Sequence, residues 1–297
     1  TNFVGSMLIS NDAGTGTLNA ASDNTGFGNE VFDDLTSGDN NTGIGAKALT
    51  KLTTGLANVA VGSSALEVNI AGSANTAVGY QALDANLASN NTAVGRSALT
   101  ANTTGATNTA VGLESLAANT TASDNTAVGK GSLTANTTGT GNIGIGVTAG
   151  GSITTGNYNV AVGNDANGSV TTAANNTAMG YFALQDNTAA DNTAVGFNAL
   201  LQNSTGANNT AIGKDALKAN TTGAENTAVG ALALDANTTG SNNVAIGRKA
   251  LTANTTADNN TAVGDNALEV NTTGAGTVAI GVSALAAQTT GGANTAV

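Results

Sequence analysis

Apolar, small and polar residues recur along this chain in a short phrase that always closes on a glycine. These glycines stand 17 residues apart at thirteen of fifteen steps and 16 apart at the other two. A fixed period of this length is typical of a solenoid, in which each repeat forms one coil stacked on the next. The phrase glycines are Gly28, Gly45, Gly62, Gly79, Gly95, Gly112, Gly129, Gly146, Gly163, Gly180, Gly196, Gly213, Gly230, Gly247, Gly264 and Gly281.

The residues before each glycine, taken as position zero, predict a short β-strand. Position −1 is apolar and position −3 is β-branched in all sixteen repeats, and position −2 is always Ala or Gly. Such alternation indicates a strand whose positions −3 and −1 share one face. Ala is common at +3, Leu stands at +4 in thirteen repeats, and a turn follows that is often Asn-Thr-Thr-Gly. We interpret +3 and +4 as a second strand that returns across the coil.

The pattern therefore predicts an all-β repeat solenoid, a parallel β-roll or β-helix of 17-residue coils. Residues 24–297 read as one continuous shaft that stops in mid-repeat, and residues 1–23 as an atypical N-terminal coil or capping segment in which Phe3-Val4-Gly5 is one more phrase. A string of amphipathic helices is the alternative. It is disfavoured because Asn-Thr-Thr-Gly has poor helix propensity and fits no 3.6-residue period.

Position −2 is never larger than Ala, which indicates close contact with another backbone. Burial of two aliphatic side chains per coil stabilises the fold by less than the conformational entropy lost when 17 residues are ordered. We therefore expect assembly with other copies to bury the additional apolar area that is needed. The −2 row would then line the axis between copies, whereas a tight corner inside one chain is the alternative. The row comprises Ala60, Ala77, Ala93, Ala110, Ala127, Ala161, Ala178, Ala194, Ala211, Ala228, Ala245, Ala262 and Ala279. The expected core of each chain comprises Val78, Leu83, Val94, Leu99, Val111, Leu116, Val128, Leu133, Val229 and Leu234.

Two features modify the regular coil. Asn occupies position −4 in fifteen of sixteen repeats, which predicts stacked amide ladders together with Asx turns. In residues 147–175 the Leu at +4 is lost twice, to Gly150 and Asn167, while Ile153 and Val170 appear at +7. We infer that +7 can turn inward and substitute for +4. A built-in bend or docking ledge is the functional alternative to neutral drift here.

Composition narrows the classes of function. The formal net charge is −11 with only eight basic residues, which argues against nucleic acid and anionic membranes as partners. Neither Cys nor His is present, so Cys/His zinc sites and Cys or His catalysis are excluded. No apolar run approaches the ~20 residues of a membrane span. Carboxylates are scattered without a recurring pair, so we expect no enzyme, no metal site and no cofactor.

Phrases such as Asn75-Thr76-Ala77-Val78-Gly79 resemble the head repeats of trimeric autotransporter adhesins, and still more the related repeats of bacteriophage tail fibres. The resemblance covers about residues 24–297. It implies left-handed parallel β-rolls, three chains to a fibre, with the −2 row toward the threefold axis. The adhesin head repeat is somewhat shorter, which leaves the turn geometry open.

Positions +1 and +2 vary freely, as expected of a solvated face. They carry four aromatic residues, Tyr80, Tyr181, Phe182 and Phe197, which are candidate contacts for a sugar or a partner. Packing against a neighbouring chain is the alternative role. Tyr181 and Phe197 stand on adjacent coils, so we expect them side by side, ~4.8 Å apart at the backbone.

These observations predict a structural and adhesive shaft of an extracellular homotrimeric fibre, on a virion or a bacterial cell surface. Such a shaft projects a binding tip toward a target, and its partner is the chain itself. A glycan or protein receptor would be met by parts outside this chain. The alternative function is an ice-binding or surface-binding solenoid that uses the Thr-Thr pairs of the turns, such as Thr103-Thr104 and Thr221-Thr222.

Overall fold

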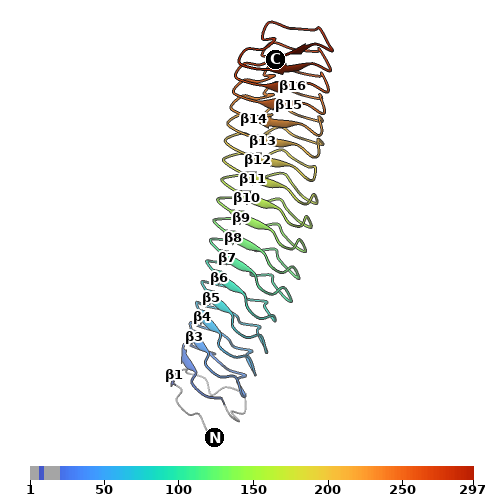
Figure 1. The fold of residues 1–297 in the computed structure, drawn as a ribbon. Coiled ribbons are helices and arrows are strands. Elements are labelled where there is room, and N and C mark those ends of the chain that lie inside the picture. Colours follow the sequence, from blue (N-terminus) through green and yellow to red (C-terminus); the bar gives the residue numbers. More distant parts are fainter. Residues whose placement is uncertain (1–6, 10–20) are drawn as a thin grey trace. The chain divides into compact units, whose positions relative to one another are not determined.

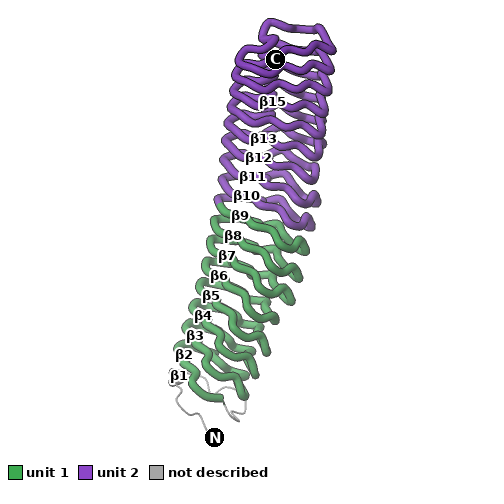
Figure 2. The backbone as a smooth tube through the Cα atoms, viewed as in Figure 1, with its two compact units in different colours: residues 1–145 green, residues 146–297 purple. Residues whose placement is uncertain are grey.

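The computed structural model describes residues 7–9 and 21–297, where it contains short β-strands joined by turns and bends and no helix. Two compact units divide the chain, residues 1–145 and residues 146–297 (Figure 2). In each unit every coil contributes one strand, and the strands of successive coils lie side by side (Figure 1). The solenoid predicted from the 17-residue period is therefore confirmed for each unit.

Unit 1 is a parallel β-solenoid whose strands pair one repeat apart. In the pairing of β7 with β8, for example, Ala110 lies beside Ala127 and Val111 beside Val128. The strands are β1 (Met7–Ile9), β2 (Thr25–Phe27), β3 (Thr42–Ile44), β4 (Val59–Val61), β5 (Thr76–Val78), β6 (Thr92–Val94), β7 (Thr109–Val111), β8 (Thr126–Val128) and β9 (Ile143–Ile145).

Unit 2 repeats this architecture. Its pairings are also parallel and one repeat apart, as between Ala211 and Ala228. The strands are β10 (Val160–Val162), β11 (Thr177–Met179), β12 (Thr193–Val195), β13 (Thr210–Ile212), β14 (Thr227–Val229), β15 (Val244–Ile246), β16 (Thr261–Val263), β17 (Val278–Ile280) and β18 (Thr295–Ala296).

The predicted return strand is wrong, because positions +1 to +6 fold into consecutive turns. The Leu at +4 has a left-handed backbone, with φ of 53° at Leu83 and 49° at Leu116, and position +2 is left-handed as well. This backbone is open to Gly and, more readily than to most residues, to Asn; it costs other residues free energy, and β-branched side chains more than an unbranched one such as Leu. It explains why no Val or Ile stands at +4, although the position is buried.

The phrase glycine is required by the distance between coils. At Gly112 φ is 136°, and a Cβ there would lie 2.5 Å from the carbonyl oxygen of Gly129 in the next coil. Gly196 in unit 2 has φ of 138° and the same 2.5 Å approach to Gly213. Any side chain at position zero would therefore force the coils apart and break the ladder between them.

Position −2 points into the coil, not outward. The Ala side chains of the −2 row are fully buried within a single chain, so the prediction that they line an axis between copies is wrong. The alternative of a tight interior corner describes them correctly. This correction applies to Ala60, Ala77, Ala93, Ala110, Ala127, Ala161, Ala178, Ala194, Ala211, Ala228, Ala245, Ala262 and Ala279.

The small size of position −2 follows from what lies opposite it. A Cβ on Gly43 would lie 3.3 Å from the ring of Phe32 and 3.1 Å from Val31, which hold the +4 and +3 positions of the preceding coil. Where those positions carry Phe and Val, position −2 is Gly; where they carry Leu and Ala, it is commonly Ala. The interior volume is thus shared between the two sides of the coil.

The predicted core is half right. Leu83, Leu99, Leu116, Leu133 and Leu234 are fully buried, as expected. The aliphatics at −1 lie on the outside because they share a strand with the inward Ala of position −2. Those wrongly assigned to the core are Val78, Val94, Val111, Val128 and Val229, of which Val94, Val111 and Val128 are 36%, 36% and 38% exposed.

Position +7 does turn inward, as inferred. Ile153 and Val170 are fully buried in the coils that lack Leu at +4, and Leu35 and Leu52 are buried at the same position in unit 1. At the beginning of unit 1, Phe3-Val4-Gly5 lie outside the described residues. The strand next to β2 is β1, with Met7 beside Thr25.

We expect Gly112→Ala to destabilise unit 1 by roughly 3 kcal/mol or more, because it combines backbone strain with a clash against Gly129. Thermal unfolding followed by circular dichroism measures the effect. Gly131→Ala is the matched control: its φ of 63° resembles that of Ser97 and Glu114 at the same position, so it should cost about 1 kcal/mol. Equal losses in the two variants would contradict this role for position zero.

Candidate interaction surface

The outward side of the strands forms the most regular exposed surface of each unit. We call it the strand face and define it as the side chains at positions −3 and −1 of β2–β9 in unit 1 and β10–β17 in unit 2. Position −1 is about two-fifths exposed at Ile44, Ile145, Ile212 and Ile246. Position −3 is Thr, Val or Ile and is partly or fully exposed.

The strand face carries no charge at any of these positions. Its side chains are β-branched with two exceptions, Phe27 and Met179, and β-branched side chains lose little rotamer entropy on contact. In-register parallel pairing repeats the same two columns every ~4.8 Å. A regular exposed array of uncharged side chains, apolar at −1 and mostly Thr at −3, suits a surface that packs against another molecule.

The −4 asparagines form the predicted amide ladder inside the coil. In unit 1, Asn41 donates from Nδ2 to Oδ1 of Asn24 at 3.0 Å, and its backbone nitrogen donates to the same oxygen at 2.9 Å. The Nδ2 group of Asn41 also donates to the carbonyl of Gly55 at 2.9 Å. Each buried amide therefore joins successive coils and holds a turn.

A second buried ladder at +7 was missed by the sequence analysis. Asn119 donates to Oδ1 of Asn102 at 2.8 Å in unit 1, and Asn220 donates to Oδ1 of Asn203 at 2.7 Å in unit 2. This Asn is the first residue of the Asn-Thr-Thr-Gly turn, and we interpreted it only as a turn former. Its strict spacing, which equals that of the −4 column, was the available signal.

The two Thr residues of each Asn-Thr-Thr-Gly turn stack in two columns along the coils, and the hydroxyls of the first column are hydrogen-bonded. Thr103 donates from Oγ1 to the carbonyl of Thr120 at 2.9 Å, and Thr221 donates to the carbonyl of Thr238 at 2.9 Å. The second Thr of each pair, as at Thr104, is exposed. The first Thr column is therefore part of the coil-to-coil ladder, and only the second presents an exposed side chain.

The aromatic residues at +1 and +2 are on the surface, as expected. Tyr80, Tyr181 and Phe197 are about half exposed, and Phe182 is partly buried. Tyr181 and Phe197 are stacked, with ring centroids 5.8 Å apart and an angle of 10° between the ring planes. Because stacked rings turn their faces toward one another, these faces are partly covered and the ring edges remain exposed. A protein surface can pack against ring edges, whereas a sugar binds on an open ring face, so a protein partner suits this geometry better.

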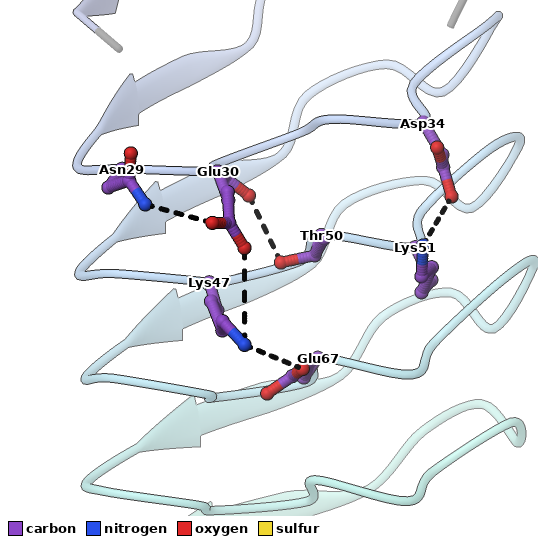
Figure 3. A network of polar contacts seen from close by, with 7 residues as sticks. All are labelled: Asn29, Glu30, Asp34, Lys47, Thr50, Lys51 and Glu67. Carbon is purple, nitrogen blue, oxygen red and sulfur yellow. Dashed lines mark hydrogen bonds and ion pairs between the residues drawn. The ribbon is translucent and has the colours of Figure 1, made fainter. Parts of the chain in front are cut away.

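Charged side chains join neighbouring coils on the turn side of unit 1 (Figure 3). Lys47 lies between Glu30 and Glu67, with Nζ 4.0 Å and 3.9 Å from the carboxylate oxygens, and the three residues stand on successive coils. Lys51 pairs with Asp34 at 3.2 Å. These pairs are solvated, so each contributes little to stability. Figure 3 shows these side chains linking neighbouring coils along the stack.

Stacked acidic residues have raised pKa values in two places. Partial burial, and then the negative charge of Glu67, raise the pKa of the Asp84 carboxyl in unit 1. In unit 2, partial burial raises the pKa of Asp235, Lys218 opposes this rise, and Asp215 adds to it. In both places burial disfavours the ionised form of the carboxyl, so ionising it costs the folded state free energy.

Among the described residues there is no group of three or more acidic, His or Cys side chains able to hold a metal ion. The same part of the chain has no helix long and apolar enough to cross a membrane. No protein-family model matches the chain, and no curated protein sequence matches it either.

We expect Asp84→Asn to raise the melting temperature at neutral pH, because it removes a carboxyl whose pKa is raised by burial and by Glu67 and whose ionisation therefore opposes folding. A raised acid pKa means that the folded state binds the proton more tightly. The destabilisation is therefore present above the folded pKa and disappears as the pH falls through it. Melting curves from neutral to acidic pH should show the variant and the natural chain converging. Asp186→Asn, at an exposed position, serves as the control. An equal rise in melting temperature in this variant would show that burial of Asp84 is not the cause of the effect.

Proposed function

We propose that this chain is a structural shaft segment of an extracellular homomeric fibre, borne by a virion or a bacterial cell. The resemblance to adhesin-head and tail-fibre repeats suggests three chains per fibre. The strand face is the single observation that carries the proposal. It is uncharged and regular in both units, with an apolar column at −1 and a column of mostly Thr at −3, and these columns would match the columns of a second copy coil by coil.

The contact between copies is reassigned in this proposal. Position −2 is enclosed by its own coil, so positions −1 and −3 are the ones left to meet a neighbouring chain. Burying Val, Ile and Thr methyl groups along many coils would supply the apolar area that one thin coil lacks. The net charge of −11 is carried elsewhere on the coil and would stay in solvent, where it limits further aggregation.

The ice-binding alternative has less support. It relied on the Thr-Thr pairs of the turns, and the first hydroxyl of each pair donates to a backbone carbonyl of the next coil, as Thr238 does to Thr255 at 2.9 Å. The turn bends between two inward residues, Asn at +7 and the small residue at +10, so its Thr residues lie on an edge and not on a flat sheet. A rigid fibre also fits the absence of Pro from the sequence.

Sedimentation equilibrium of the chain tests the proposal. We expect a mass three times the protomer mass of 28.4 kDa. Val111→Lys together with Ile212→Lys places one charge on the strand face of each unit and should shift the mass to that of a monomer, since buried unpaired charges are costly.

Thr104→Lys together with Thr222→Lys is the matched control, because it adds the same charges to exposed turn positions. This control should keep the mass of the assembly. A natural chain that sediments as a monomer would contradict the fibre. Ice shaping by such a monomer in a thermal-hysteresis assay would favour the alternative function.

A further inference from the structure

The coil that begins at Gly163 in unit 2 carries an unusual buried amide. Asn167 occupies position +4, where most coils have Leu, and is fully buried. Its backbone φ of 55° is the left-handed conformation that +4 requires, which Asn adopts more readily than most residues. The residue therefore suits the backbone of the coil while bringing a polar group into an apolar interior.

Asn167 differs from the ladder asparagines because neither amide atom has a hydrogen-bond partner. Among the buried side chains that the structure describes, it alone lacks a partner at both its oxygen and its nitrogen. By contrast, Asn203 donates to Asn187 and to Gly206, each at 2.7 Å. The coil before Asn167 has Gly150 at +4, so no side chain from that position packs over it. A buried amide without partners costs free energy and weakens its coil.

The residue that follows is Gly168, and this is the single Asn-Gly dipeptide in the whole sequence. Hydrogen bonds hold the backbone nitrogens on both sides, from Asn167 to Ala183 at 2.9 Å and from Ser169 to Gln185 at 2.8 Å. No such bond is found for the Gly168 nitrogen within the described residues. Gly168 also has no side chain that could shield this nitrogen.

We propose that Asn167-Gly168 is a site of spontaneous deamidation that slowly weakens unit 2. The Gly168 nitrogen loses its proton to hydroxide and attacks Cγ of Asn167, the bond from Cγ to Nδ2 breaks, and ammonia leaves. Water then adds to either carbonyl of the resulting succinimide and opens it to aspartate or isoaspartate. One water is consumed and one ammonia released, with no oxidant or reductant.

The product disturbs the coil in which it forms. A carboxylate at the buried +4 position loses the solvation it needs. Isoaspartate also adds one methylene to the main chain and so shifts the register of the coil against its neighbours.

Peptide mapping by mass spectrometry of the full chain, held in mildly alkaline buffer, tests the proposal. Asn203-Ser204 is the internal control, because Asn203 is also buried in unit 2 but hydrogen-bonded. The deamidation rate at each site is measured in the folded chain and in concentrated urea. The ratio of the two rates removes the intrinsic reactivity of the dipeptide. We expect Asn167 to retain a several-fold larger fraction of its unfolded rate than Asn203 does. An equal or smaller fraction would overturn the proposal.

Two variants separate the chemistry from folding. Gly168→Ala should slow the reaction at Asn167 several-fold. A Cβ at residue 168 would lie 3.1 Å from the carbonyl oxygen of Asp165. The position accepts a side chain in later coils, where Gln185 and Leu201 stand, so we expect this variant to fold. Asn167→Leu restores the regular repeat and should abolish the mass gain in this peptide and raise the melting temperature. Ageing should lower the melting temperature of the natural chain but not that of Asn167→Leu. Equal losses in both would show that Asn167 is not the cause.

Discussion

Each coil of this protein depends on the coils on either side of it for nearly every polar contact. The ladder hydrogen bonds hold successive coils at one spacing, at which the backbone at position zero lies so close to the next coil that only glycine fits, and the same spacing applies to all other columns. At that spacing the two columns of buried asparagine amides also fall into line. A single coil would leave all of these groups unpaired, so the stack is the smallest stable structure.

The narrow interior has a direct consequence for the outer surface. Leu at +4 fills most of the space inside a coil, and the strand opposite can offer only a methyl group or hydrogen at position −2. The aliphatic residues on either side of that small residue must then point outward. An interior too thin to hold all of the apolar residues thus leaves the aliphatic column at −1 exposed on the strand face, which is why we propose that copies assemble through this face.

The coils at 146–175 show which requirements of the repeat are strict. Gly150 and Asn167 satisfy the left-handed backbone at +4, although neither supplies the Leu side chain. Ile153 and Val170 restore apolar volume from +7, at the cost of two members of the second asparagine ladder. Backbone geometry is therefore kept while packing and polar pairing are compromised. The unpaired amide of Asn167, which we propose as a deamidation site, lies in one of these two coils.

The sequence by itself determined the period, the parallel register, the strand that precedes each phrase glycine, the buried Leu at +4 and the −4 amide ladder. It could do so because identical residues at a fixed spacing must stack on one another in a solenoid. It did not determine which face of the strand points inward, since a strand of three residues alternates equally well in either sense. Only the tertiary structure decided this, because the choice depends on the volume left opposite the strand by Leu at +4. The left-handed turns at +2 and +4, and the second ladder that they position, likewise depend on how the whole coil closes and not on the local pattern of residues.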